Sequence, residues 1–178
     1  MSVGDLAREL GTTDRTLRRL AGVGTIRSHG TRPGLRRALP AEAPYLRGHW
    51  KLLSGLRAAL RTEPKVLAAL LFGSVATGHD SPSSDIDLVV AVESDPSLRD
   101  LNDLRRRIEG TVGRTVDLFV LDDLLAEPER LGPILDEARP IVDRACVWPQ
   151  LQDLRRKLSR GNSAASLRRR LAPRSVVS

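Results

Sequence analysis

The pattern of apolar and polar positions predicts two short helices at the start of the chain. Their inward faces consist of residues three or four positions apart, namely Leu6, Ala7 and Leu10 in the first helix and Leu17 and Leu20 in the second. Gly11 suits the end of the first helix because glycine accepts a positive φ, and the hydroxyl of Thr12 or Thr13 can cap the second. Two helices joined by so tight a turn are expected to cross and pack on each other.

The outward side of the second predicted helix is basic, and the segment after it is also rich in arginine. Two short stretches, residues 25–28 and 35–39, flank a turn containing Gly and Pro, which is the pattern of a hairpin wing. Residues 1–43 therefore resemble a winged helix-turn-helix that binds DNA. The side chains expected to contact DNA are Thr13, Arg15, Arg18, Arg19, Arg27, Arg32, Arg36 and Arg37. A helical pair used only for packing or dimerisation is the alternative.

A long helix with one apolar face is predicted after this head. Its apolar residues recur every three or four positions, namely Leu46, Trp50, Leu53, Leu56 and Leu60. Pro44 suits the first turn of the helix. The pair Glu63-Pro64 ends it, because proline disfavours a helical conformation in the residue before it. We expect this helix to join the head to a second domain.

The second domain has the pattern of a small α/β fold. Three short apolar runs predict buried strands, namely VLAALLF (66–72), SDIDLVVAV (84–92) and TVDLFVL (115–121). Between the second and third strands, a helix is expected to begin with Asp95 as its N-cap and Pro96 in its first turn, and to end at Gly113. Proline-broken helical pieces are expected in residues 124–142, and an amphipathic helix in 149–160 closes the domain.

The charge is divided unevenly along the chain. The 178 residues carry a net charge of +7, with a basic head (net +8 over residues 1–62), an acidic middle (net −8 over 63–150) and a basic tail (net +7 over 151–178). Basic ends of this kind can attract polyanions. No apolar run is long enough to span a membrane, MSVGDLAREL does not resemble a signal peptide, and the single cysteine, Cys146, excludes an intramolecular disulfide. We therefore expect a cytoplasmic protein without a membrane partner.

Two aspartates interrupt the second apolar run. Because side chains alternate along a strand, Asp85 and Asp87 are expected to share one face, while their apolar neighbours point into the core. Adjacent carboxylates repel each other, and a divalent cation such as Mg²⁺, which prefers oxygen ligands, relieves that conflict. Asp117 stands out in the same way in the third run, and it completes a three-carboxylate cluster if the two strands are neighbours. The Gly73-Ser74 turn at the end of the first strand lets backbone amides approach a phosphate.

The stretch FGSVATGHDSPSSDIDLVV, followed by a lone aspartate in an apolar strand, resembles the DNA polymerase β-like nucleotidyltransferase superfamily, in particular its minimal, MNT-type members. The resemblance covers residues 50–145 and implies a small α/β (α+β) domain with a mixed sheet. One departure is Thr77, which stands where many relatives have arginine before the second glycine of the loop. A contact to phosphate or to a partner is then lost or supplied elsewhere.

The resemblance also implies roles for five residues. Asp85, Asp87 and Asp117 would be catalytic and would hold two Mg²⁺ ions, and Asp117 would help to activate the incoming hydroxyl. Gly73 and Ser74 would bind the triphosphate of an NTP, with ATP favoured. Asp122 and Asp123 compete with Asp117 as the third acid, but LDDLL reads as the start of a helix, where acids stabilise the helix dipole.

We expect a nucleotidyltransferase that moves a nucleotidyl group, with AMP from ATP favoured, to a hydroxyl of a protein or an RNA. The resemblance implies membership of a toxin–antitoxin pair, with the antitoxin role favoured, and a HEPN-type toxin or tRNA as the acceptor. The domains expected are the winged helix-turn-helix in residues 1–43, the nucleotidyltransferase domain with its leading helix in 44–148, and a basic helix and tail in 149–178. The head suggests binding to its own operator, and a homodimer fits the paired half-sites that such heads read.

Two other functions compete with this one. The first is a DNA-binding transcription regulator whose second domain is a catalytically inactive nucleotidyltransferase fold that senses nucleotide or binds a partner. The second is a small-molecule adenylyltransferase, as in aminoglycoside resistance. The basic head disfavours the latter, and the sequence shows no drug-binding domain after the catalytic one.

Overall fold

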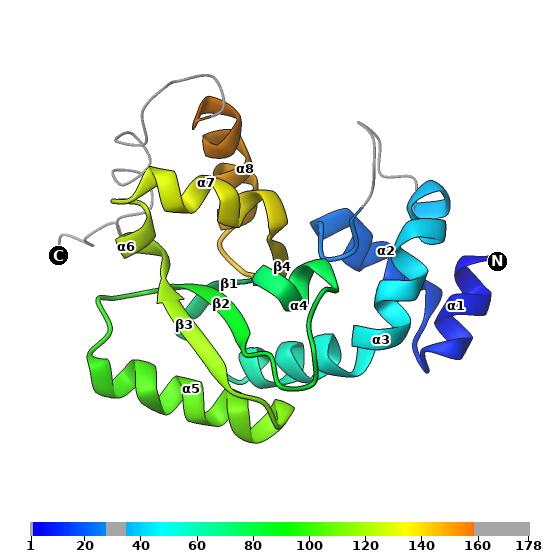
Figure 1. Ribbon diagram of the computed structural model, residues 1–178, viewed down its shortest axis with the longest axis horizontal. Coiled ribbons are helices and arrows are strands. Elements are labelled where there is room, and N and C mark those ends of the chain that lie inside the picture. The colour runs from blue at the N-terminus through cyan, green and yellow to red at the C-terminus, as the bar shows by residue number, and fades with distance from the viewer. Residues whose placement is uncertain (1, 28–34, 159–178) are drawn as a thin grey trace, which may run out of the picture. The chain divides into compact units, whose positions relative to one another are not determined.

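The computed structural model describes residues 2–27 and 35–158 (Figure 1). The chain divides into two compact units, Met1–Gly55 and Leu56–Ser178. The described residues form eight helices and four strands, and all four strands lie in the second unit. Among these residues, no helix is both long and apolar enough to cross a membrane.

The first unit begins with the two short helices that the apolar pattern predicted. α1 (Val3–Glu9) and α2 (Asp14–Val23) are joined by a turn at Gly11, whose φ of 64° favours glycine. Thr13 caps α2, because its hydroxyl accepts a hydrogen bond from the Thr16 amide at 3.1 Å. The buried faces of the two helices include Leu6, Ala7, Leu17 and Leu20. The helical pair and its tight turn are therefore confirmed.

The hairpin wing expected after these helices is wrong in its second segment. Residues 35–39 are not a strand but the first residues of α3 (Leu35–Arg61). Residues 25–27, in the first expected segment, are not a strand either. Residues 28–34, which complete the expected wing and include Arg32, lie outside the described residues.

α3 begins well before Pro44, where the sequence pattern expected its first turn. A proline inside a helix lacks the amide that would donate to the fourth residue before it, so Pro44 removes one backbone hydrogen bond. The helix nevertheless continues because its apolar face stays buried, and Ala43, Leu46 and Leu53 are each at most 1% exposed. Tertiary packing thus outweighs the local signal of the proline. The domain boundary expected after residue 43 falls inside this helix and stays a prediction.

The second unit is built on four strands, β1 (Val66–Phe72), β2 (Ile86–Val92), β3 (Val116–Val120) and β4 (Arg139–Asp143). Their order in the sheet is β3-β2-β1-β4 (Figure 1). β1 pairs antiparallel with β2 and with β4, whereas β2 pairs parallel with β3. The three strands predicted from apolar runs are confirmed, and the sheet is mixed, as expected.

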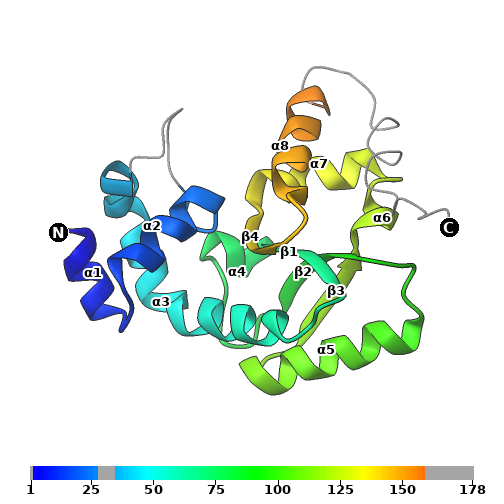
Figure 2. The same cartoon turned by 180° about the vertical axis from the view of Figure 1, so that it is seen from behind.

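Helices cover both faces of this sheet. They are α4 (Gly73–Thr77), α5 (Leu98–Val112), α6 (Leu121–Leu124), α7 (Pro128–Glu137) and α8 (Val147–Leu158). On one face, leucines of α6, α7 and α8 pack with Ala68, Leu70 and Val89 into a common core. α5 lies on the opposite face in both views (Figures 1 and 2). A sheet covered on both sides explains why its strands read as continuous apolar runs.

The start of α5 differs from the expected one. The helix begins at Leu98 with Ser97 as its N-cap, not at Asp95 and Pro96. The Ser97 hydroxyl accepts from the Asp100 amide, and the Asp100 carboxylate accepts from the Ser97 amide, both at 3.1 Å. This reciprocal cap supplies two hydrogen bonds where Asp95 alone would supply one. The predicted end at Gly113, with φ 70°, is confirmed.

β4 is the strand that the sequence pattern missed, since only helical pieces were expected before residue 143. It contains Pro140, which lacks a backbone donor and would argue against a central strand. β4 lies at the edge of the sheet, where one side needs no partner, so the proline is tolerated. α8 begins at Val147, because the Asp143 carboxylate at the end of β4 accepts hydrogen bonds from the first amides of the helix.

Candidate active site

Asp87 and Asp117 are brought together by the parallel pairing of β2 with β3. They occupy opposite positions in the register of the two strands, where neighbouring chains lie about 4.8 Å apart. Asp87 is half-buried and Asp117 is exposed. Burial, followed by the negative charges of Asp117 and Asp85, raises the pKa of the Asp87 carboxyl above its ordinary value. The three carboxylates therefore lie near enough for each charge to act on Asp87.

Asp85 precedes β2 instead of lying in it. The strand begins at Ile86, so the expectation that both aspartates lie within the strand is wrong for Asp85, whereas the expectation that the two side chains share one face stays a prediction. The pairing explains this start: β1 ends at Phe72, opposite Asp87, and the ladder to β3 opens with the Ile86 amide donating to the Thr115 carbonyl at 2.9 Å. Asp85 lies just outside both ladders and is exposed.

Gly73 stands at the junction of β1 and α4 and packs against Asp87. Its φ is 72°, a conformation that side-chain-bearing residues rarely adopt. A Cβ at this position would overlap Oδ2 of Asp87 and lie 3.3 Å from its carboxyl carbon. Glycine is required here for two reasons, the backbone conformation and the close approach of the carboxylate.

Ser74 lies in the first turn of α4, a short helix that the sequence pattern did not predict. The Thr77 hydroxyl donates to the carbonyls of Gly73 and Ser74, at 3.1 and 3.0 Å, and so tightens this turn. Gly78, at φ 80°, then ends the helix. The first amides of a helix have no acceptor inside it, so those at Gly73 and Ser74 are suited to an anionic ligand. Thr77, where the sequence departs from the expected pattern, therefore stabilises this turn through its hydroxyl.

The donor set fits a divalent cation held together with a nucleotide. Mg²⁺ prefers carboxylate oxygens and commonly binds through one or two carboxylates and the phosphates of a substrate. Burial and, after it, the charges of Asp117 and Asp85 raise the pKa of the Asp87 carboxyl, and a bound cation would offset both effects. Within the described ranges, no three His, Cys, Asp or Glu side chains converge closely enough to hold a metal ion by themselves.

Arg139 is a buried cation beside α4 that the sequence reasoning missed. It is the first residue of β4, is 2% exposed, and donates from Nε to the Ala76 carbonyl at 2.7 Å. This bond ties the single turn of α4 to the sheet. The signal available in the sequence was an arginine next to an apolar stretch, in ARPIV, where a buried charge needs polar partners.

The residues expected to contact DNA on α2 are accessible. Arg15, Arg18 and Arg19 are exposed on this helix, and Arg18 forms an ion pair with Asp14 at 3.0 Å. Thr13 is also exposed, although its hydroxyl already accepts the bond that caps the helix.

The remaining expected DNA contacts do not form a wing in the described structure. Arg27 is half-buried, and its backbone amide donates to the Glu42 carboxylate at 3.1 Å. Arg36 and Arg37 belong to the start of α3, but their side chains, like the whole of Arg32, lie outside the described part.

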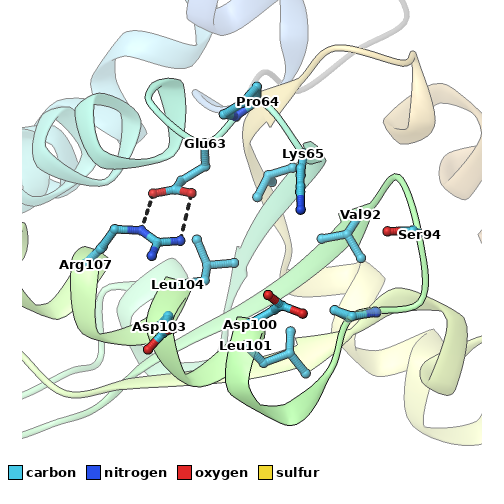
Figure 3. A pocket seen from close by; sticks show the side chains of 12 residues that line it. Glu63, Pro64, Lys65, Val92, Ser94, Asp100, Leu101, Asp103, Leu104 and Arg107 are labelled. Carbon is cyan, nitrogen blue, oxygen red and sulfur yellow. Dashed lines mark hydrogen bonds and ion pairs between the residues drawn. The ribbon is translucent and has the colours of Figure 1, made fainter.

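A pocket of about 260 Å³, whose lining Figure 3 shows, lies at the other end of the β1–β2 pair from Asp87. Its lining includes Val66 and Val92, which pair where β1 begins and β2 ends. Arg107 closes one side through its ion pair with Glu63, at 2.6 Å. None of the three site aspartates lines this pocket. It therefore belongs to a different region of the second unit.

The part of the chain that carries these residues is similar to known proteins. Residues 55–145 match the family described as "Polymerase beta, Nucleotidyltransferase". The match spans half of the chain and includes the Gly-Ser turn and all three aspartates. A search of curated proteins found no match.

Two solved structures with TM-scores of 0.50 and 0.52 share the fold. A toxin–antitoxin crystallised with AMP-PNP is 17% identical at a TM-score of 0.50, over 61% of this chain and 87% of that chain. A mutant of the toxin–antitoxin MntA–HpeT is 16% identical at a TM-score of 0.52, over the same shares. A third structure, described as a "putative minimal nucleotidyltransferase", is 35% identical at a TM-score of 0.42, over 49% of this chain and 89% of that chain. By its family match and its mixed four-stranded sheet, the chain belongs to the polymerase beta nucleotidyltransferase family.

Proposed function

We propose that the protein transfers a nucleotidyl group, with AMP from ATP favoured, to a hydroxyl of a protein or an RNA. One observation carries this proposal: Asp87 faces Asp117 across the β2–β3 pair and packs directly on Gly73, where α4 begins. Acidic ligands for a cation and a turn suited to phosphate therefore adjoin each other. Phosphoryl transfer needs that combination, because charge on the phosphates must be neutralised while the reacting groups are held in line.

Each residue has a distinct part in the proposed reaction. Two Mg²⁺ ions held by Asp85, Asp87 and Asp117 would neutralise charge on the triphosphate and on the attacking oxygen. The amides of Gly73 and Ser74 and the Ser74 hydroxyl bind phosphate oxygens. The carboxylate of Asp117, which is exposed and open to an acceptor, takes the proton of the acceptor hydroxyl. The hydroxyl oxygen bonds to the α-phosphorus, the bond from that phosphorus to the bridging oxygen breaks, and pyrophosphate leaves.

Incubation with Mg²⁺ and α-³²P-labelled NTPs, one at a time, in cell lysate and with total tRNA, tests this function. We expect label on a discrete protein or RNA band with the wild type and none with the Asp85→Ala/Asp87→Ala variant. The Asp122→Ala/Asp123→Ala variant is the matched control, since it removes two exposed acids from the start of α6 and should label normally. If no NTP gives transfer, or if the Asp85→Ala/Asp87→Ala variant labels as well as the wild type, the proposal is wrong.

A toxin–antitoxin pair is the proposed setting, with this protein as the antitoxin and a HEPN-type toxin as the acceptor. The support is that two solved structures with this fold, at TM-scores of 0.50 and 0.52, come from toxin–antitoxins. An adjacent gene for a HEPN-type protein, whose product takes up label only with the wild-type enzyme, is the expected result. Label confined to tRNA would instead indicate a toxin that modifies RNA.

We also propose that the first unit binds DNA through α2. The support is a helical pair with a tight glycine turn and an outward face that carries Arg15, Arg18 and Arg19. A homodimer would fit the paired half-sites of an operator. A protein that shifts DNA from its own promoter but transfers no nucleotide would instead be a regulator with an inactive nucleotidyltransferase fold.

A further inference from the structure

Arg114 joins two segments that meet at the candidate active site. It lies between Gly113, which ends α5, and the start of β3. Its Nε donates to the Ser84 carbonyl at 3.1 Å, and its Nη2 donates to the carbonyls of Ser81, at 3.3 Å, and Ser84. Its Nη1 forms an ion pair with the Asp80 carboxylate at 2.9 Å. The two side chains are only 20% and 9% exposed, so water screens this pair weakly.

These contacts hold the residue directly before Asp85. Asp85 itself is exposed and outside the strands, so no ladder holds its own backbone. The residue before it, Ser84, is held by Arg114, and the residue after it, Ile86, donates its amide to the carbonyl of Thr115 at 2.9 Å. Arg114 and Thr115, which are adjacent in the sequence, thus hold the two residues that flank Asp85.

The same segment carries the third acid of the site. Asp117 follows Thr115 after a single residue and faces Asp87 in the β2–β3 register. A shift of Arg114 would therefore move Asp85 relative to the pair formed by Asp87 and Asp117. The sequence pattern alone did not single out Arg114, because its acceptors come from a loop about thirty residues earlier in the chain.

We propose that Arg114 is a positioning residue for Asp85, and that it sets the distance between this carboxylate and the Asp87–Asp117 pair. This inference rests on the proposed nucleotidyl transfer. The guanidinium suits this positioning role because its planar fork donates to several acceptors at once in a fixed geometry. A lysine ammonium has no such fixed geometry. A misplacement of about 1 Å in such a site typically costs about 100-fold in rate.

Arg144 offers a matched control. It also donates to backbone carbonyls, those of Leu60, Arg61, Glu63 and Val66, but it does so near the start of β1, at the end of the sheet away from the aspartates. Arg144→Ala therefore removes a comparable set of bonds from the same unit without touching the loop before Asp85. Both variants are expected to lower the melting temperature.

The test compares wild type, Arg114→Ala, Arg114→Lys and Arg144→Ala in the full chain. We expect kcat to fall about 100-fold in Arg114→Ala, with KM for the NTP nearly unchanged, and to recover only in part in Arg114→Lys. Arg144→Ala should keep the wild-type kcat. Wild-type kcat in Arg114→Ala, or an equal loss in Arg144→Ala, would overturn the inference.

A second readout separates this inference from the proposed function. Hydrogen–deuterium exchange of the peptide spanning residues 80–87 needs no activity. Arg114→Ala should raise exchange at the Ser84 and Ile86 amides, which donate to the carbonyls of Ser81 and Thr115, while Arg144→Ala should not. Unchanged exchange in Arg114→Ala overturns the positioning role even if the wild type is active. If the wild type transfers no nucleotide, the proposed function fails. The positioning of Asp85 is then supported if Arg114→Ala binds Mn²⁺ more weakly than Arg144→Ala does.

Discussion

The carboxylate of Asp87 lies against the α-carbon of Gly73, in the space where a side chain at that position would begin. The contact joins β2 to the junction of β1 and α4, so an acid and a phosphate-binding turn occupy adjoining positions. The identity of one residue therefore constrains the other: the carboxylate can lie there only while position 73 is glycine.

Gly73→Ala should destabilise the fold and abolish activity. The new Cβ would overlap Oδ2 of Asp87, and alanine would have to adopt a φ of 72°. Strain of this kind costs about 1–3 kcal/mol. Urea denaturation measures the free energy of unfolding, and the transfer assay measures activity.

Gly110→Ala is the control for that substitution. Gly110 lies inside α5, where a Cβ would meet nothing within 4 Å. Alanine is preferred over glycine inside a helix by up to about 1 kcal/mol, so this variant should be as stable as the wild type or more so. Equal stability of the two glycine variants would contradict the close packing of Gly73 on Asp87.

Asp87→Asn should lower the rate of transfer by more than about 100-fold, since residues that merely support metal ligands already contribute 10- to 100-fold. The transfer assay measures this loss.

Without divalent cation, the stability of the Asp87→Asn variant should not fall below that of the wild type. The pKa of the Asp87 carboxyl is raised by burial and by the acids at 117 and 85, so the ionised form destabilises the folded state at neutral pH. Melting temperatures in EDTA show whether Asp87→Asn is at least as stable as the wild type, with the variant of the exposed Asp95, Asp95→Asn, as control.

Mg²⁺ together with a non-hydrolysable ATP analogue should stabilise the wild type. A ligand present at 100 times its Kd adds about 2.7 kcal/mol to the free energy of unfolding, provided that it binds only the folded state. Asp87→Asn should lose most of this stabilisation because it lacks a central ligand of the proposed metal site. Thermal unfolding with and without EDTA gives the measurement, and equal stabilisation of both proteins would rule out a role for Asp87 in binding.

If Arg15 and Arg19 contact phosphates, Arg15→Ala and Arg19→Ala should both weaken DNA binding. For each variant, the loss of affinity should be nearly the same whatever the DNA sequence. The slope of log K against log salt concentration should then fall by about one for each variant. Arg99→Ala is the control, because Arg99 is an exposed arginine on α5 in the second unit. Fluorescence anisotropy with duplex DNA over a range of salt concentrations measures the slopes. Identical slopes for the wild type and both α2 variants would refute phosphate contacts by this helix.

The sequence by itself determined much of the second unit. Continuous apolar runs marked β1, β2 and β3, and a sheet covered on both faces buries most residues of its two central strands, β1 and β2. Asp87 and Asp117 were visible as charges inside such runs, and the Gly-Ser turn was visible at the end of the first one. These features are local, and their spacing was sufficient to indicate the family.

Other features depended on contacts between distant segments, and the tertiary structure alone decided them. The buried face of α3 carries the helix through Pro44, and the edge position of β4 tolerates Pro140. Asp85 proved to lie outside the strand because pairing with β1 and β3 begins only after it. Arg114 and Arg139 gained their roles from backbone carbonyls that lie far from them in the sequence. Periodicity reports which face of an element is apolar, but it does not report which distant donor will meet which acceptor.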